Sequence, residues 1–283
     1  MKDTLFSIKK TLNIKGIPHR IEHPLIMGII NLTPDSFYSG SRITNDKDLL
    51  RKVETMVSEG ADIIDIGGYS SRPGAMDISV KEELKRILPA IDKIIKSFPG
   101  LILSIDTFRG EVARSAVEAG AAMINDISGG IIDSAMINTI SDLKVPYVLM
   151  HMQGTPQNMK SFTEYQNIFM DISIYLNRRI NELNKKGVYD IIIDPGFGFA
   201  KTVPQNYDLL KNLTYFEVLG YPILVGISRK SMIYKSLDIS SSESLNGTSV
   251  LNTIALLKKA SILRVHDVKE AKEVIDLVRM CGI

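Results

Sequence analysis

Short apolar runs that end in polar residues recur eight times along the chain. They cover residues 25–30, 63–66, 101–105, 121–124, 145–150, 191–193, 221–227 and 260–265. Such runs are typical of parallel strands that are buried on both faces. Because a helical pattern follows each run, we predict an α/β fold, a (β/α)8 TIM barrel. The active site of such a barrel lies at the C-terminal ends of its strands, where the polar residues fall.

Capping and turn residues predict helices between the runs. Ser79, with Glu82 three residues later, predicts the start of a helix over 80–97. Gly120 and Gly187 are expected to end helices over 111–119 and 164–186. Further helices are expected to begin near residue 46 and to cover 133–142, 207–219, 243–259 and 268–280.

A hairpin is expected before the first apolar run. Residues 11–14 and 20–23 alternate apolar and polar positions around a turn at 15–18. We expect this hairpin to close the bottom of the barrel. The whole chain, 1–283, is then a single domain, with residues 1–24 as the hairpin extension and 25–283 as the barrel.

Two of the predicted connections are unusually long. They cover residues 32–45 and 67–78, whereas most strand-to-helix loops take about 2–6 residues. Both follow strands at the predicted catalytic face. We therefore expect them to be mobile loops that close over a substrate.

Composition narrows the class of protein. The 283 residues have an apolar content of 45%, and no segment approaches the ~20 apolar residues of a membrane span. One cysteine, Cys281, excludes an internal disulfide framework, and the N-terminal residues lack a secretory apolar core, so we expect a cytoplasmic protein. The net charge of +2 predicts neither nucleic-acid nor membrane binding. An anionic substrate would therefore need local Arg and Lys residues.

Acids and an amide stand at three strand ends. Asp106, Asn125 and Asp194 follow the third, fourth and sixth runs. Carboxylates in an apolar pocket suit a heterocycle with ring N–H and amino donors. Lys230 could compensate a deeply placed Asp. Alternatively, Asp106 and Asn125 could each cap the helix that follows.

Cations gather at other strand ends. Arg264 and His266 are two residues apart and point to the same side of the eighth strand. Since an Arg in an apolar strand is costly to bury without an anion, we favour a phosphate site that includes Arg72. The alternative is a structural Arg264 paired with Asp267 or Glu270. The histidines lack zinc-ligand spacing, and Asn31 alone does not justify a metal site.

The residues at the strand ends match the motifs of a known family. Residues 26–37, 60–68 and 71–75 resemble the first two signatures of dihydropteroate synthase. Further matches, in family order, are residues 104–107, 124–129, 149–152, 194–201, 226–231 and 264–267. The ordered set is highly specific, and it extends over nearly the whole predicted barrel.

The resemblance implies a reaction and its partners. The family condenses 6-hydroxymethyl-7,8-dihydropterin diphosphate with p-aminobenzoate, giving 7,8-dihydropteroate and diphosphate in folate biosynthesis. It is a transferase family that uses Mg²⁺ and is the target of sulfonamides. The family also implies a homodimer formed through the last helices. There Val274, Ile275, Val278 and Met280 are either an exposed apolar stripe or core residues.

The resemblance also assigns roles to residues. The catalytic set would be Asp106, Asp194, Lys230 and Asp35, the last excluding water with its loop. The pterin pocket would comprise Asp106, Asn125, Ile127, Met150, Asp194, Phe199, Gly226, Lys230 and Arg264. Diphosphate would bind Asn31, Arg72, Arg264 and His266, with Asn31 also reaching Mg²⁺. The p-aminobenzoate site would comprise Ser71, Pro73, Phe199, Lys230 and Ser231.

The sequence departs from the family motifs at two positions, and there are two alternative functions to consider. Tyr69 stands where many members have Glu or Val, and Ser71 where most have Thr, although Ser71 keeps the hydroxyl. A methyltransferase that passes a folate methyl group to a corrinoid protein would share the barrel but needs no diphosphate site. A non-catalytic pterin-binding paralogue is disfavoured because residues 71–73 of the p-aminobenzoate loop are present.

Overall fold

The computed structural model describes residues 8–33, 46–72 and 76–282. Eight parallel strands form one sheet in the order β8-β7-β6-β5-β4-β3-β10-β9. A parallel bridge between Ile193 and Ile223 brings the two edge strands together and so closes the barrel. The strands are β3 (Leu25–Asn31), β4 (Ile63–Gly67), β5 (Ile102–Asp106), β6 (Met123–Asp126), β7 (Tyr147–Met150), β8 (Ile191–Asp194), β9 (Leu224–Val225) and β10 (Ile262–Val265). The predicted fold class is confirmed.

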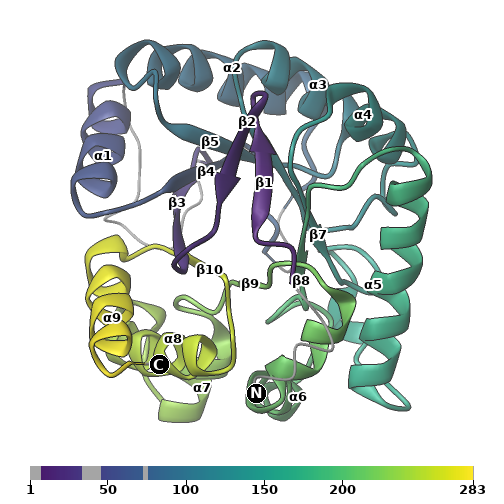
Figure 1. Ribbon diagram of the computed structural model, residues 1–283, viewed down its shortest axis with the longest axis vertical. Coiled ribbons are helices and arrows are strands. Elements are labelled where there is room, and N and C mark those ends of the chain that lie inside the picture. Colours follow the sequence, from purple (N-terminus) through teal and green to yellow (C-terminus); the bar gives the residue numbers. More distant parts are fainter. Residues whose placement is uncertain (1–7, 34–45, 73–75, 283) are drawn as a thin grey trace.

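Helices surround the barrel (Figure 1). They are α1 (Asp46–Ser58), α2 (Val80–Ser97), α3 (Gly110–Glu118), α4 (Met136–Leu143), α5 (Ile168–Lys185), α6 (Val203–Lys211), α7 (Ser231–Leu237), α8 (Leu245–Leu257) and α9 (Val268–Met280). Short 3₁₀ turns lie at Met159–Ser161, Leu213–Leu219 and Ser241–Glu243. The apolar faces of the helices pack on the outward-pointing residues of the strands and form the largest core of the molecule.

The helix starts follow capping chemistry, and this corrects some predicted boundaries. The Ser79 side chain accepts from the Glu82 backbone N–H, as predicted. Thr202 and Gln205 form a complete capping box, so α6 begins at Val203 and not at the predicted residue 207. The expected helix over 207–219 is instead the end of α6 followed by a 3₁₀ turn. The seven-residue helix α7 was not predicted.

The N-terminal hairpin is present, but its second strand is not where we predicted it. Strands β1 (Thr11–Ile14) and β2 (Ile17–Arg20) pair antiparallel, whereas residues 20–23 were expected to form the second strand. Lys15 and Gly16 both have positive φ, 51° and 82°. A two-residue turn with two positive φ angles matches the strand twist and allows the chain to reverse at once.

The hairpin closes the bottom of the barrel, as expected. It lies across the middle of the ring of strands (Figure 1). Leu12 and Ile14 are buried in one cluster with residues from the N-terminal halves of the barrel strands, among them Met27, Ile63 and Val148. This packing leaves the C-terminal end of the barrel as the open side.

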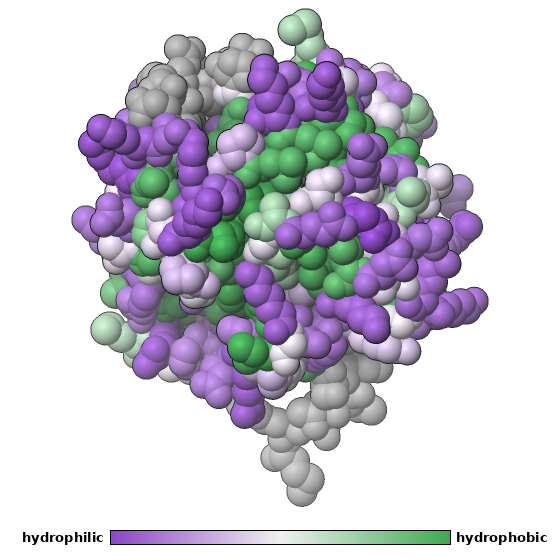
Figure 2. All heavy atoms as spheres, turned by 90° about the horizontal axis from the view of Figure 1, so that it is seen from above, coloured by the Kyte–Doolittle hydropathy of each residue, from purple (hydrophilic) through white to green (hydrophobic). Residues whose placement is uncertain are grey.

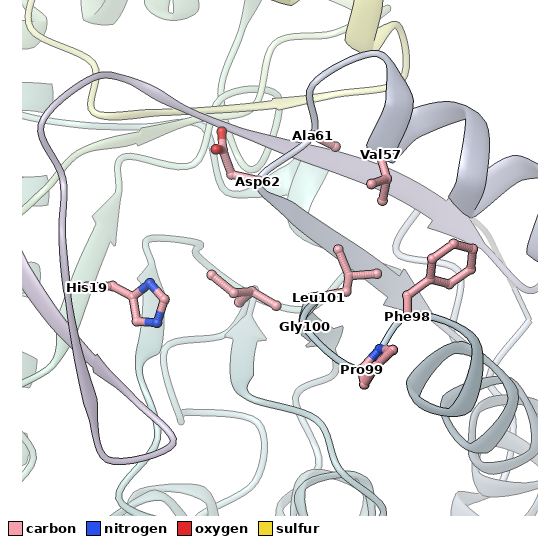
Figure 3. Close-up of a pocket in the computed structure, with 9 residues that line it drawn as sticks. His19, Val57, Ala61, Asp62, Phe98, Pro99, Gly100 and Leu101 are labelled. Atoms are coloured by element: carbon pink, nitrogen blue, oxygen red, sulfur yellow. The ribbon is translucent and has the colours of Figure 1, made fainter.

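A cavity of about 370 Å³ lies at the closed end (Figure 3). It is lined by His19 of the hairpin, by Asp62 just before β4 and by the Pro99–Gly100 turn before β5. The Asp62 carboxylate accepts a hydrogen bond from the Ile26 N–H at 2.8 Å. Because barrel chemistry occurs at the opposite end of the strands, this cavity is not the candidate active site.

The outer surface is mainly hydrophilic on the face that Figure 2 shows, with hydrophobic residues visible between the polar ones. Within the described ranges, none of the helices combines the length and apolarity needed to span a bilayer. On α9, Val274 and Ile275 are buried and Val278 is partly buried against the core, so most of the proposed apolar stripe is core. Met280 is exposed.

Candidate active site

Backbone pairing aligns the polar ends of neighbouring strands. Asn31 is paired with Gly67, Gly67 with Asp106, and Asp106 with Asn125. The parallel register therefore places side chains from three strands at one level of the open barrel end. On the other side of the sheet, Asp194 of β8 is paired with Met150 of β7.

Arg264 of β10 connects two carboxylates across the barrel. Its Nε donates to Asp65 Oδ2 and its Nη2 donates to Asp106 Oδ2, each at 2.7 Å. Asn125 Nδ2 donates to the same Asp65 oxygen at 2.9 Å. These four side chains form one network, which we call the Arg264 network. The expected alternative of Arg264 paired with Asp267 or Glu270 is wrong.

The helix-capping alternative for Asp106 and Asn125 is wrong as well. The N-cap residue of α3 is Arg109 and that of α4 is Ala135. The side chains of Asp106 and Asn125 bind within the Arg264 network instead. Arg264 therefore holds Asp106 and Asp65 holds Asn125, both at the barrel mouth.

Asp65 is a member of the network that our prediction of site residues missed. It is fully buried in β4, and its Oδ1 atom has no hydrogen-bond partner in the described structure. A signal was present in the sequence, because Asp65 interrupts an otherwise apolar strand, Ile63–Gly67. A buried carboxylate at such a position needs a cation, and Arg264 is that cation.

Asp106 is poised to change its charge near neutral pH. Its pKa is raised to about 7, first by burial and then by the negative charges of Asp65, Glu83 and Asp126, in spite of the opposing effect of Arg264. Arg264 is the main factor that favours the ionised form. The network thus holds a carboxylate whose proton affinity depends on a single guanidinium.

The turn after β8 brings Asp194 to the same mouth. Asp194 is buried, and burial raises its pKa, although the Lys230 ammonium and the Gly196 N–H oppose the shift. Its Oδ1 accepts from the Gly196 N–H at 2.7 Å. Lys201 Nζ donates to the carbonyls of Gly196 and Phe199 at 2.9 and 3.0 Å, and so fixes the turn.

Lys230 lies between Asp194 and the aromatic end of this turn. Its ammonium donates to the Phe197 carbonyl and lies 4.6 Å from the centre of the Phe199 ring. Burial lowers its pKa to about 8, and the neighbouring Asp194 charge opposes that shift. A Cβ built on Gly226 would lie 3.9 Å from Lys230 Nζ and 3.8 Å from Arg264 Cβ, so Gly226 is adjacent to both cationic residues.

An apolar wall completes the mouth. Ile127 and Met150 are buried in a cluster that includes Tyr69 and Phe108, and Phe199 packs against it. Three residues predicted to line one pocket are therefore brought together. This wall lies between the ends of β4, β5, β6, β7 and β8.

His266 lies at the cationic end of the mouth. Burial lowers its pKa to about 3, and the positive charges of Arg264, Arg229 and Arg72 contribute. Ser228 Oγ lies 3.0 Å from His266 Nδ1 and accepts from the His266 backbone N–H at 3.2 Å. His266 is therefore neutral at physiological pH and can still donate a hydrogen bond.

Arg229 proves to be a structural residue. Its Nε and Nη2 donate to the two oxygens of Asp267 at 2.9 and 2.8 Å. Its Nη1 donates to the carbonyls of Ser241 and Ser242. The partner that we considered for Arg264 is thus taken by Arg229, which holds the loop before α8.

The remaining predicted residues lie around the rim or outside the described ranges. Four of them are partly buried: Asn31 at the end of β3, Ser71 and Arg72 in the loop after β4, and Ser231 at the start of α7. Asp35 and Pro73 lie outside the described residues. The predicted site residues that the structure describes could be identified from the sequence because they stand at or after the ends of predicted strands.

The arrangement can be compared with known proteins. Residues 27–266 match the family model described as pterin binding enzyme. The dihydropteroate synthase of Escherichia coli strain K12 is 39% identical over 266 residues, which are 93% of this chain and 94% of the relative. The chain belongs to the dihydropteroate synthase family.

Solved structures agree with this assignment. A Yersinia pestis dihydropteroate synthase in complex with a sulfonamide drug has a TM-score of 0.92 at 36% identity, with 96% of this chain and 99% of that chain covered. A Xanthomonas albilineans dihydropteroate synthase with 4-aminobenzoic acid has a TM-score of 0.87 at 35% identity, with 96% and 98% covered. The family, the barrel and the dihydropteroate synthase function predicted from the sequence are confirmed.

Proposed function

We propose that this enzyme transfers a dihydropterin-methyl group from its diphosphate ester to the amine of p-aminobenzoate, an alkyl transfer that is not a methyl transfer. The Arg264 network is the observation that carries the proposal. It places paired carboxylates, an amide and a guanidinium at the open end of a barrel. That combination suits a flat heterocycle joined to an anionic leaving group.

The pterin is expected to bind between the network and the Phe199 side of the mouth. Its ring N–H and amino groups would donate to the carboxylates of Asp106 and Asp194 and to the amide oxygen of Asn125. The Asn125 side chain already donates its N–H to Asp65, which leaves its oxygen for a ligand donor. Ile127 and Met150 would pack on the ring as part of the apolar wall.

The diphosphate is expected at the cationic rim formed by Arg72, Arg264 and His266. The positive charge of Arg72 contributes to the lowered pKa of His266, which supports a shared anion site for the two residues. Neutral His266 would serve as a hydrogen-bond donor, whereas the two arginines supply charge. Arg264 would then be shared between the diphosphate and the network.

Mg²⁺ is the cofactor that the resemblance implies, and the donor chemistry fits it. Asn31 ends β3 at the mouth and is partly exposed, and an amide oxygen is a hard ligand. Since Mg²⁺ typically keeps several waters and uses few protein ligands beside substrate phosphates, one such oxygen is sufficient. When bound, Mg²⁺ would neutralise charge that develops on the departing diphosphate.

p-Aminobenzoate is expected on the Lys230 side. Phe199 would pack on its ring, with Ser71 and Ser231 as hydroxyl donors toward its carboxylate. The short distance between Lys230 and the Phe199 ring places a cation beside an aromatic surface. Pro73, predicted for this site, and Asp35, predicted to help exclude water, remain proposals on residues outside the described ranges.

The reaction needs no protein nucleophile. The bond between the methylene carbon and the diphosphate oxygen breaks first, and both electrons leave with the diphosphate. The resulting cation is delocalised into the dihydropterin, where the Asp106 and Asp194 carboxylates would stabilise it. The amine lone pair then forms the carbon–nitrogen bond, and the amine releases one proton to solvent or to diphosphate.

The rate is expected to depend on pH in a bell shape. As the pH falls below about 7, Asp106 takes up a proton and its stabilising negative charge is lost. As the pH rises above about 8, Lys230 gives up its proton and its positive charge is lost. Since kcat/KM reports the free enzyme, it should be highest between these values.

Steady-state assays from pH 5.5 to 10 would measure this profile. Lys230→Arg is the matched control, because an arginine stays protonated and should remove the alkaline limb, at lower activity. A kcat/KM that is constant from pH 6 to 9 would contradict the assignment of both groups.

We also propose a cytoplasmic homodimer, the assembly that the family implies. Four apolar residues of α8 and α9 are exposed in the single chain, namely Val250, Leu257, Leu277 and Met280. Their burial against a second copy would remove apolar area from water. Sedimentation equilibrium should give twice the chain mass of 31.4 kDa, and a mass of one chain at micromolar protein would contradict the dimer.

The proposed function is tested by diphosphate release. The purified protein should release diphosphate from the pterin substrate only when both p-aminobenzoate and Mg²⁺ are present. Release from the pterin diphosphate alone, at a rate that p-aminobenzoate does not change, would mean a hydrolase and not a synthase.

A further inference from the structure

Tyr69 departs from the family motif, and the structure shows where it lies. It follows Gly67-Gly68 at the end of β4 and is 7% exposed. Its ring belongs to the apolar wall that also contains Ile127 and Met150. Tyr69 therefore connects the pocket wall to the loop that carries Ser71 and Arg72.

The ring of Tyr69 is held on two sides. The Phe108 ring meets it edge-on, with centroids 4.9 Å apart and an interplanar angle of 82°. The Arg109 guanidinium lies 5.2 Å from the ring centroid, within the range of a cation–π contact. Phe108 and Arg109 both follow β5. The start of the loop after β4, which we call the β4 loop, therefore packs on the end of the neighbouring strand.

The hydroxyl of Tyr69 has a hydrogen-bond partner on another segment and a charged neighbour on its own loop. Gln157 Nε2, from the segment after β7, donates to Tyr69 Oη at 2.6 Å. The negative charge of Asp77 is close enough to the Tyr69 hydroxyl to raise its pKa. Asp77 stands at the far end of the same loop, only three residues before α2. The hydroxyl thus fixes the start of the loop to the segment after β7, and the end of the same loop brings a negative charge near it.

Arg109 holds the end of the loop. Its Nη2 donates to Asp77 Oδ1 at 3.0 Å and to the Ile78 carbonyl at 2.6 Å. Its Nη1 donates to Glu83 Oε2 at 2.9 Å, and buried Glu83 also accepts from Thr107. The buried Glu83 carboxylate therefore fixes Arg109, and Arg109 contacts both ends of the loop.

We propose that Tyr69, Asp77 and Arg109 form a cluster that joins the two ends of the β4 loop and thereby positions Ser71 and Arg72. The inference rests on the proposed function, because that function gives Ser71 and Arg72 their ligands. Tyr69, Asp77 and Arg109 are positioning residues, since they act on substrate through the loop. A looser loop would be competent in a smaller fraction of molecules, which raises the apparent dissociation constant in inverse proportion to that fraction.

Tyr69→Phe is the sharpest variant, because it keeps the ring in the wall and removes only the hydroxyl. We expect the KM for p-aminobenzoate to rise about five-fold, the factor that one ordinary hydrogen bond provides, with kcat within two-fold of wild type. Asp77→Ala should have a similar effect, and the double variant should be no worse than the larger single effect. The Asp77 side chain is mostly exposed, so its removal should leave the fold intact.

Tyr221→Phe is the matched control. It also removes a hydroxyl that is bonded to a side-chain amide, that of Asn184 at 3.1 Å, at a distance from the β4 loop. Its KM and kcat should equal those of wild type. The second readout is amide hydrogen exchange of Tyr69 to Arg72, which should be faster in Tyr69→Phe than in Tyr221→Phe and needs no catalytic activity.

The outcomes separate the cluster from the proposed function. A wild-type protein that makes no dihydropteroate would contradict the function, and the exchange rates would still decide whether the cluster orders the loop. Unchanged exchange and unchanged KM in Tyr69→Phe would overturn the inference. So would additive effects of Tyr69→Phe and Asp77→Ala, or equal effects of Tyr69→Phe and Tyr221→Phe.

Discussion

Replacing Arg264 with alanine should lower kcat/KM by two to three orders of magnitude. The guanidinium is the shared donor to Asp65 and Asp106 and, in our proposal, a ligand of the diphosphate. Loss of one preorganised donor to developing charge typically costs about 3–4 kcal/mol, which is about 10²–10³ in rate. Without Arg264 the pKa of Asp106 should also rise, because the main factor that lowers it is gone.

Two further variants separate charge from geometry. Arg264→Lys keeps the positive charge but cannot hold two carboxylates at once, so it should recover only a small part of the activity. Arg178→Ala, on the exposed side of α5 with its side chain 80% exposed, is the control for loss of an arginine and should be active. If the kcat/KM of Arg264→Ala at saturating Mg²⁺ were within three-fold of wild type, the proposed role of the Arg264 network would be wrong.

Replacing Gly196 with alanine should destabilise the protein by about 2–5 kcal/mol. Gly196 has a φ of +77°, where a side chain costs about 1–2 kcal/mol. In addition, its Cβ would lie 2.0 Å from the His151 carbonyl oxygen, so backbone must move. Overpacking of this kind typically adds about 1–3 kcal/mol.

Gly187→Ala is a matched control that measures the cost of the positive φ angle without a clash. Gly187 has nearly the same φ, +78°, but nothing lies within 4 Å of a Cβ built there. It should cost only about 1–2 kcal/mol. Urea unfolding of the two variants would compare the free energies of unfolding. Equal losses of unfolding free energy in the two variants would contradict the close approach of Gly196, after β8, to the His151 carbonyl, after β7.

The strands of the barrel could be predicted from the sequence because each is a short apolar run with a polar end. The helix ends were harder to predict. Residues 207–219 read as one helix, yet the Thr202 capping box starts α6 earlier and a 3₁₀ turn replaces its second half. The hairpin's second strand was misplaced because the turn takes two residues with positive φ and not four.

Most of the candidate site could be predicted from position alone, but its internal pairing could not. Asp106 and Arg264 are 158 residues apart in sequence, and only barrel closure makes them neighbours. Asp267 lies closer to Arg264 in sequence, but it follows the strand and pairs with Arg229. Asp65 was missed because a single acid within an apolar strand does not reveal its partner.

In the proposed function, the open end of this barrel joins a dihydropterin to p-aminobenzoate. The most direct test of this function is to incubate the purified protein with Mg²⁺ and both substrates and to quantify 7,8-dihydropteroate and diphosphate in the same sample. We predict equal molar amounts of the two products, with both reduced at least a hundred-fold in Arg264→Ala. Diphosphate without dihydropteroate, or equal product yields from the wild type and Arg264→Ala, would contradict the account.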